Sequence, residues 1–318
     1  MLTSADLAAR TDRAVAAAAD AGRDLGLTVT DPRVLYDVFS VVVHLSPAPV
    51  VVRVPTVLPR TLAADPDAQA AQQRSELAVA GWLADRDHPV VPPSPLVARE
   101  PVRRDGFSMT FWQFVEQVSD ADPDAGRRAT VTAHLHAALR EYPAELPFLV
   151  PLDGSVPGGL AQLEHYPDLL DAADLDRARR EWAVVEPLIC SRTAFEAAFS
   201  GADVQPIHGD APHYNIIVTP GGELCSDFEH VTLGPVEWDL ALAGPQCQAA
   251  YDAAAARLGL RPLDERLLRV MESAGMLQAV ACLALVPQLP MLAEGLRPLL
   301  DHWRTTPLAG RLDESGSP

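Results

Sequence analysis

The chain has 318 residues, of which 48% are hydrophobic and 21% are charged, and its formal net charge at pH 7 is -18. This length and composition are typical of a soluble globular protein of one or two domains and exclude a disordered chain. The acidic balance argues against nucleic acid and anionic membranes as partners, because both are bound through basic patches. An acidic field favours cationic small molecules, although acidity that serves only solubility explains the charge equally well.

Cysteine spacing and the N-terminal segment indicate a reducing compartment. No C-x-x-C pair occurs among the four cysteines, which are Cys190, Cys225, Cys247 and Cys282. Neither a zinc site nor a disulfide framework is therefore predicted. Charges between Asp6 and Arg13 interrupt any apolar core of a signal peptide. Since no window of about twenty residues is apolar and free of charge, we expect no membrane span and a cytoplasmic protein.

The N-terminal part begins with a helical signal followed by strand signals. An Ala-rich stretch from about Ser4 to Leu25 predicts a helix, and Asp31-Pro32 is expected to form a break in regular secondary structure after it. Two β-branched runs, Val34 to Leu45 and Val50 to Val54, flank the turn from Ser46 to Pro49. Runs of this kind about a short turn predict a β-hairpin.

A second helix and a second hairpin follow. Asp65-Pro66-Asp67 has the composition of a helix start, and Ala68 to Arg86 has an apolar face at helical spacing. Leu96 to Ala98 and Phe107 to Val118 flank the polar turn from Arg103 to Gly106 and predict the hairpin. Together these elements predict a small lobe of mixed helix and strand.

Helical signals dominate the remainder of the chain. They cover Arg127 to Glu141, Leu175 to Phe199 with a break expected near Pro187, and several segments from Gln246 to Arg304. The polar tail from Gly310 to Pro318 is expected to fray.

The chemistry-bearing residues concentrate between His208 and Ala241. Asp210, Asn215 and Asp227 lie within eighteen residues, and the hairpin predicted at 216–226 returns Asp227 towards the other two. Carboxylate and amide oxygens gathered in this way suit Mg²⁺, which keeps water and substrate phosphate in its shell. Phosphoryl transfer needs a carboxylate that orients the attacking hydroxyl, together with an amide and a second carboxylate that hold the metal. Asp210 fits the first role, and Asn215 and Asp227 fit the second.

The pattern H-G-D-x-x-x-x-N from His208 to Asn215, followed by D-F-x-x and G-P-x-x-W-D-L-A, resembles the aminoglycoside phosphotransferase and choline kinase-like family of small-molecule kinases. In protein kinases an arginine occupies the position of Gly209 and a glycine that of Glu229. The resemblance implies a two-lobed, protein-kinase-like α+β fold. We expect a strand-rich, nucleotide-clamping lobe at residues 1–116 and a helical lobe at 117–318, with their boundary between Glu116 and Asp120. A buried polar hairpin without catalysis is the alternative reading.

The resemblance also implies how the nucleotide phosphates are held. A cation on a strand pairs with a carboxylate on the following helix and contacts the phosphates, and the matching residues here are Arg53 and Glu76. Arginine in place of lysine departs from the protein-kinase form, because its reach and donor geometry differ. The alternative is an ordinary ion pair. No glycine-rich G-x-G-x-x-G or G-x-x-x-x-G-K motif is present, so Rossmann and P-loop sites are excluded.

Two further nucleotide contacts follow from the resemblance. The turn from Asp37 to Ser40 is expected on the phosphate side, with the Ser40 hydroxyl towards the nucleotide, although a plain strand segment fits equally well. Backbone groups near Gln113 and Val115 are expected to contact the adenine edge, and a buried edge strand is the alternative there.

Three other residues are expected to be structural. His134 and His136 lie two apart on a predicted helix, so they do not share a face and are predicted to pack or to face solvent. Asp239 is expected to anchor the loop that carries Asp210, with a contact to substrate as the alternative. His213, in the same loop, either touches substrate or faces solvent.

The sequence therefore predicts an ATP-dependent kinase with Mg²⁺ as cofactor and GTP as the alternative nucleotide. Its acceptor is expected to be a hydroxyl of a small polar molecule, with an aminoglycoside or amino sugar favoured. A kinase for choline, a macrolide or a metabolic sugar is one alternative. A nucleotide-binding pseudokinase without turnover is the other.

Overall fold

The computed structural model of the chain describes residues 1–118, 124–152 and 154–306. The chain divides into two compact units. A strand-rich unit contains Met1–Ala121, Ile217–Glu229 and Pro287–Pro290, and a helical unit contains Asp122–Ile216, His230–Val286 and Met291–Pro318. The predicted tail at 310–318 and residues 119–120 of the predicted boundary lie outside the described residues.

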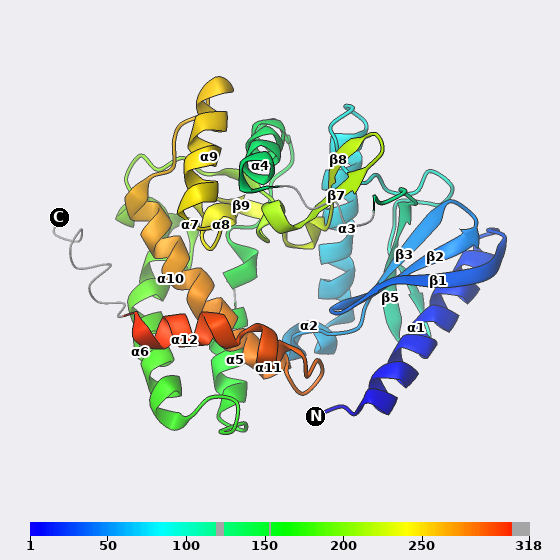
Figure 1. The fold of residues 1–318 in the computed structure, drawn as a ribbon, viewed down its shortest axis with the longest axis horizontal. Coiled ribbons are helices and arrows are strands. Elements are labelled where there is room, and N and C mark those ends of the chain that lie inside the picture. The colour runs from blue at the N-terminus through cyan, green and yellow to red at the C-terminus, as the bar shows by residue number, and fades with distance from the viewer. Residues whose placement is uncertain (119–123, 153, 307–318) are drawn as a thin grey trace. The chain divides into compact units, whose positions relative to one another are not determined.

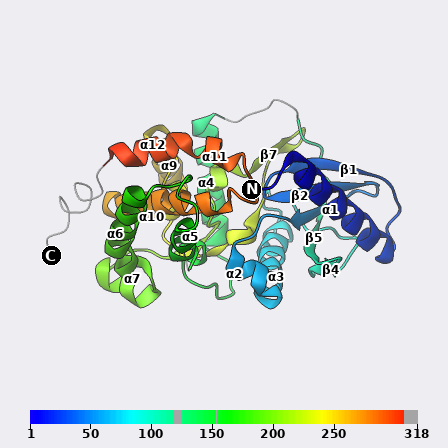
Figure 2. The ribbon, with the colours of Figure 1, turned by 90° about the horizontal axis from the view of Figure 1, so that it is seen from below.

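The strand-rich unit is built on an antiparallel five-stranded sheet with the strand order β1-β2-β3-β5-β4 (Figure 1). Valine and leucine at every second position of β2 and β3 point to one face, as the two-residue period of a strand requires. Helix α1 covers that face with buried alanines such as Ala14 and Ala18, and it runs beside the sheet in both ribbon views (Figures 1 and 2). The strands are β1 (Val29–Asp37), β2 (Ser40–Pro47), β3 (Val50–Pro55), β4 (Val102–Arg104) and β5 (Phe107–Gln113), and the helix is α1 (Ser4–Asp24).

Helices α2 (Arg60–Ala64) and α3 (Pro66–Ala84) follow β3, and α3 packs against β5. Asp65 caps α3, because its side chain accepts hydrogen bonds from the backbone amides of Asp67 and Ala68. The hairpin of β7 (Ile216–Thr219) and β8 (Gly222–Cys225) is joined to this unit through a backbone bridge between Val90 and Cys225.

The helical unit has its core around α10, which packs against α5, α6, α8 and α12, while α4 lies beside α9 (Figure 1). Gly159 on α5 permits a close approach to α10, since a Cβ there would lie 2.7 Å from the carbonyl oxygen of Ala281. The described helices are α4 (Ala125–Leu139), α5 (Ser155–Leu163), α6 (Ala172–Ile189), α7 (Arg192–Ala198), α8 (Glu237–Leu240), α9 (Pro245–Arg257), α10 (Glu265–Ala281), α11 (Leu292–Gly295) and α12 (Arg297–Thr305), and the strands are β6 (Gln205–Ile207) and β9 (Thr232–Gly234).

By length and composition, one segment of the described chain, Glu265–Leu285, would be able to cross a membrane. In the structure 61% of its apolar window is buried inside the protein. It therefore has the burial of a core helix, because α10 packs on four other helices of the unit.

The first predicted hairpin needs correction. The run from Val34 to Leu45 is two antiparallel strands, since β1 ends at Asp37 and β2 begins at Ser40. Moreover, β1 starts at Val29 and includes Asp31-Pro32, where a break in regular secondary structure was expected. Proline is tolerated there because β1 is an edge strand, and its pairing with β2 is irregular between Val29 and Asp31.

The second predicted hairpin was also placed wrongly on one side. The partner of β5 is Val102–Arg104, whereas Leu96–Ala98 forms no strand, and β5 ends at Gln113 rather than at Val118. The charged β4 is an edge strand, where charges are common and hide the alternation that identifies strands. In the helical unit, α6 continues through Pro187, and the break follows Cys190, where Ser191 caps α7.

Candidate active site

The loop from His208 to Asn215 leaves β6 and carries Asp210. Its first two residues are fixed by Asp239 of α8, which accepts hydrogen bonds from the amide of His208 at 2.9 Å and the amide of Gly209 at 2.8 Å. The indole of Trp238 donates to the carbonyl of Gly209 at 2.8 Å. The expectation that Asp239 anchors this loop is thus confirmed.

The backbone of this loop requires glycine at position 209. It has a φ of 86°, which L side chains rarely adopt, and a Cβ would lie 1.9 Å from the carbonyl oxygen of His230. The arginine of the protein-kinase pattern has no room in this backbone arrangement.

His136 of α4 extends the anchor. Its Nε2 lies 2.9 Å from Asp239 Oδ2, its Nδ1 lies 2.8 Å from the hydroxyl of Tyr251 on α9, and its side chain is fully buried. His136 is therefore structural, as predicted, but its link to the Asp210 loop was missed. A histidine three residues before Leu139 on a helix looks like a packing residue, and no spacing in the sequence connects it to Asp239.

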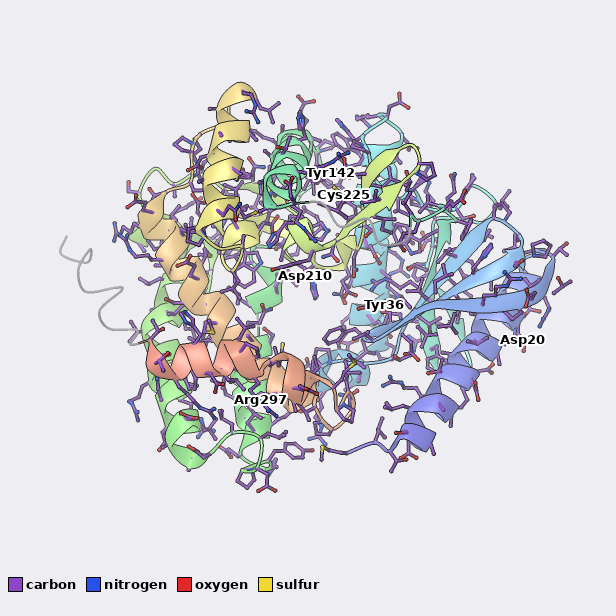
Figure 3. All side chains as sticks on the ribbon, in the orientation of Figure 1. Asp20, Tyr36, Tyr142, Asp210, Cys225 and Arg297 are labelled. Atoms are coloured by element: carbon purple, nitrogen blue, oxygen red, sulfur yellow. The ribbon has the colours of Figure 1, made fainter. Side chains whose placement is uncertain are left out.

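Asp210 is labelled in Figure 3, and its carboxylate is ionised at neutral pH. Its side chain is 51% exposed, and Nδ1 of His230 lies 3.8 Å from its Oδ2. Partial burial alone would raise the pKa of Asp210, but hydrogen bonding by His230 and the charges of His230 and His208 outweigh it and lower the pKa to about 2. Asn215 Nδ2 donates to the carbonyl oxygen of Asp210 at 2.8 Å, so the predicted metal-binding amide belongs to the same loop.

His213, three residues after Asp210, is buried and does not face solvent. Burial lowers the pKa of its imidazole to about 4, so the ring is neutral at pH 7. Its backbone carbonyl accepts a hydrogen bond from Arg128 at 2.5 Å. This hydrogen bond holds the loop backbone at His213 to Arg128 of α4.

A second cluster lies in the strand-rich unit around Arg53 of β3. Arg53 Nη2 donates to Glu76 Oε2 on α3 at 3.0 Å, so the ion pair predicted from the sequence is present. Glu229 Oε2 accepts from Nη1 at 2.8 Å and from Nη2 at 2.9 Å, and Asp227 Oδ1 lies 3.4 Å from Nη1. Burial raises the pKa of Glu76, with Arg53 lowering it in part, whereas the surrounding carboxylates raise the pKa of Arg53 despite its burial.

The donor set at Arg53 fits a divalent cation. Three carboxylates surround a single guanidinium, and the buried Oε1 of Glu76 and Oδ1 of Asp227 accept no hydrogen bond from the described residues. This excess of negative charge and of hard oxygen atoms suits Mg²⁺. In the described part of the chain no group of three or more His, Cys, Asp or Glu side chains is arranged to hold a metal ion. Asp227 would therefore hold the ion in this unit with water and phosphate completing its shell.

The remaining predicted nucleotide contacts lie in the strand-rich unit. Ser40 is buried, and its Oγ accepts from Arg53 Nη1 at 3.4 Å, so the hydroxyl points at the cation. The turn before it is held by hydrogen bonds at Phe39, whose carbonyl oxygen accepts them from the amides of Thr56 and Val57 at 3.0 Å. The amide of Gln113 donates to the carbonyl oxygen of Pro92 at 2.9 Å, and Gln113 pairs with Val50 of β3. The contacts of Gln113 and Val115 with adenine stay predictions.

Comparison with known proteins supplies a family and a fold. The model of a family described as the phosphotransferase enzyme family matches residues 35–272. No curated protein sequence matches the chain at a significant level. Choline kinase LicA from Streptococcus pneumoniae is similar in structure, with a TM-score of 0.60 and 13% identity over 90% of this chain and 98% of that chain.

Two further solved structures are similar over most of the chain. Aminoglycoside phosphotransferase APH(3'')-Id from Streptomyces rimosus has a TM-score of 0.55 and 19% identity, covering 82% of this chain and 96% of its own. Amicoumacin kinase hAmiN, in complex with AMP-PNP, Ca²⁺ and Ami, has a TM-score of 0.59 and 14% identity. The match covers 96% of this chain and 97% of that chain. These likenesses confirm the predicted fold class, a two-lobed, protein-kinase-like α+β fold.

Proposed function

We propose that the chain, which belongs to the phosphotransferase enzyme family, transfers the γ-phosphate of ATP to a hydroxyl of a small polar molecule. An aminoglycoside or amino sugar is the favoured acceptor. The predicted family and the predicted enzyme class, a phosphotransferase with an alcohol group as acceptor, are both confirmed by this membership. The nucleotide, the metal and the acceptor are our proposals.

The observation that carries the proposal is the anchored loop around Asp210. Two backbone amides bound to Asp239 and an indole bound to Gly209 fix the loop, and Asp210 lies in it as an exposed, ionised carboxylate. Phosphoryl transfer depends mainly on positioning and on electrostatic stabilisation, so a fixed carboxylate that accepts the hydrogen bond of an attacking hydroxyl is what it needs.

Arg53 and its carboxylates support the nucleotide part of the proposal. We assign residues 1–116 to nucleotide clamping, with Arg53 and Glu76 for the phosphates, Ser40 in the phosphate-side turn, and the backbone near Gln113 and Val115 for adenine. Asp227 and Asn215 are proposed ligands of Mg²⁺, and residues 117–318 are proposed to carry the substrate site. The cation, the oxygen donors and the buried position of the cluster support this assignment.

The net charge of -18 supports a cationic acceptor, because an acidic protein attracts amines over a distance of about one Debye length. Choline, macrolides and metabolic sugars are the other acceptors to include. The four cysteines without C-x-x-C spacing support a cytoplasmic location.

The test is a screen for ADP production with ATP and Mg²⁺ over hydroxylated compounds, aminoglycosides and amino sugars first. We expect ADP release that depends on an aminocyclitol or amino sugar and on the divalent metal. Stronger turnover with choline, a macrolide or a neutral sugar would move the proposal to that acceptor class. Metal-dependent binding of ATP with no acceptor-dependent ADP release from any compound would contradict the proposed transfer.

A further inference from the structure

The two terminal nitrogens of Arg53 have all their donors engaged. They carry four N–H groups, which donate to Glu76 at 3.0 Å, to Glu229 at 2.8 and 2.9 Å, and to Ser40 at 3.4 Å. The side chain is only 10% exposed. A phosphate oxygen therefore reaches these donors only by replacing one of their present partners.

The three hydrogen-bond partners differ in how easily they are replaced. The side chain of Glu76 is 1% exposed and Ser40 is buried, so both are enclosed by the unit. The side chain of Glu229 is 23% exposed, and its Oε2 accepts charge-assisted hydrogen bonds from both terminal nitrogens, which are the donors that arginine also offers to a phosphate. Glu229 is the partner that an incoming anion from solvent meets and resembles.

The backbone of Glu229 is held independently of its carboxylate. Its carbonyl oxygen accepts a hydrogen bond from Gln72 Nε2 of α3 at 3.0 Å, and the residue lies in a short 3₁₀ helix, Phe228–His230. A change of partner at Arg53 is therefore a rotation of the Glu229 side chain and leaves the backbone in place.

We propose that in the nucleotide-free protein the carboxylate of Glu229 occupies the place on Arg53 that a nucleotide phosphate takes, so that phosphate and Glu229 exclude each other there. This inference rests on the proposed nucleotide binding at Arg53. Once displaced, Glu229 is an additional oxygen ligand two residues from Asp227, where the excess carboxylates suit a divalent metal. Nucleotide and metal then strengthen each other's binding, because each favours the same rotation of Glu229.

Arginine is better suited than lysine to such an exchange of partners at position 53. A lysine has three donors on one nitrogen, whereas the planar fork of arginine keeps Glu76 on one side while it exchanges a carboxylate for a phosphate on the other. The pairing of Arg53 with Glu229 thereby replaces the lysine and glycine of the protein-kinase pattern as a set.

The test is the dissociation constant of ADP, measured by isothermal titration calorimetry in EDTA and in MgCl₂. The proteins are wild type, Glu229→Gln and the matched control Glu100→Gln, the same substitution at an exposed glutamate of the strand-rich unit that pairs with Arg74. We expect Glu229→Gln to bind ADP about tenfold more tightly than wild type in EDTA, since a competing charge-assisted contact is lost. Glu100→Gln should change this constant by less than about threefold.

The outcomes separate the inference from the proposed function. If wild type binds no ADP even with MgCl₂, nucleotide binding at this site is contradicted, and the inference with it. If wild type binds ADP but Glu229→Gln leaves the constant in EDTA unchanged, or if Glu100→Gln tightens binding equally, the inference alone is overturned. Glu229→Asp, which draws the charge back by one methylene, replaces the glutamine variant if that variant does not fold, and the same gain in EDTA is expected.

Discussion

At the scale of single residues, the buried Glu76 depends on Arg53. The Glu76 side chain is 1% exposed, and it forms an ion pair with Arg53 of β3. Removing one member of a buried ion pair leaves the other uncompensated in a poorly solvated place, which costs far more than the pair itself contributes. The pair is thus a stability determinant of the strand-rich unit, whatever its part in phosphate binding.

Arg53→Ala is expected to lower the free energy of unfolding by about 3–5 kcal/mol. Adding Glu76→Gln should restore part of this loss, with a coupling energy of about 1 kcal/mol or more between the two sites. Urea denaturation of the two single variants, the double variant and wild type provides the cycle. Arg74→Ala breaks an exposed pair with Glu100 and should cost less than about 1 kcal/mol. Additive effects of the Arg53 and Glu76 variants would show that the pair is not coupled.

The loss in Arg53→Ala should also depend on pH. Burial raises the pKa of the Glu76 carboxyl above its unfolded value of 4.5. For an acid with a raised folded pKa, stability is fully present below the unfolded pKa and is lost as pH rises through the folded pKa. Because the variant has lost the cation that opposes this shift, its deficit should be larger at pH 8 than at pH 5. An equal deficit at both values would mean that Glu76 does not titrate in this range.

Which site residues were predictable depends on whether the signal is local. Arg53 is recognisable because a charge inside a β-branched strand needs a partner, whereas its pairing with Glu76 was implied by the family resemblance. The contact of Glu229 with Arg53 was not predicted, since the direction of a side chain after a hairpin is set by packing far away in sequence. The requirement for Gly209 became visible only with the carbonyl of His230 beside it.

At the scale of elements, three helices hold the start of the Asp210 loop through His136. This side chain of α4 joins Asp239 of α8 to Tyr251 of α9, and all three side chains are buried. A buried polar chain of this kind rigidifies its surroundings only while every member is satisfied. The loop's order is therefore expected to depend on a residue that lies outside it.

His136→Ala is expected to lower the free energy of unfolding by about 1–3 kcal/mol, because Asp239 and Tyr251 each lose a buried partner. Tyr251→Phe removes only the outer hydroxyl and should cost about 1 kcal/mol. Hydrogen exchange distinguishes a role in the loop from general packing. The amides of His208 and Gly209 should exchange faster in His136→Ala than in Tyr251→Phe, and equal exchange in the two variants would contradict the link.

The elements that were predicted well have strong local patterns. Helix α1 was found from its alanines, and α3 from Asp65 and its apolar face. The errors fall on β1 and β4, both edge strands, where a proline and three exposed or half-exposed residues obscure the two-residue period.

At the scale of the whole molecule, two segments from the second half of the chain belong to the strand-rich unit. They are Ile217–Glu229, which carries Asp227, and Pro287–Pro290, whose Gln288 binds the backbone of Leu58. Local periodicity cannot reveal such returns of the chain. The linear division at residue 116 stays a prediction about function.

Burial across both units predicts the reactivity of the cysteines. Cys190 is exposed, whereas burial raises the pKa of the thiols of Cys225 to about 12 and of Cys282 to about 11, and also raises that of Cys247. Only Cys190 should react rapidly with a disulfide reagent in the native protein at pH 8, because the thiolate is the nucleophile. All four should react in urea, and Cys190→Ser should abolish the rapid phase. A second rapid thiol in the native protein would contradict the packing described.

The central claim, that Asp210 orients the acceptor hydroxyl, is tested most directly by comparing turnover and ADP affinity of Asp210→Asn with those of wild type. The substitution keeps the size of the side chain and removes the charge that a pKa of about 2 maintains at neutral pH. The account predicts that kcat falls by about 10²- to 10⁴-fold, while the Kd for ADP in MgCl₂ stays within about twofold of wild type. Unchanged turnover, or a loss confined to nucleotide affinity, would contradict it.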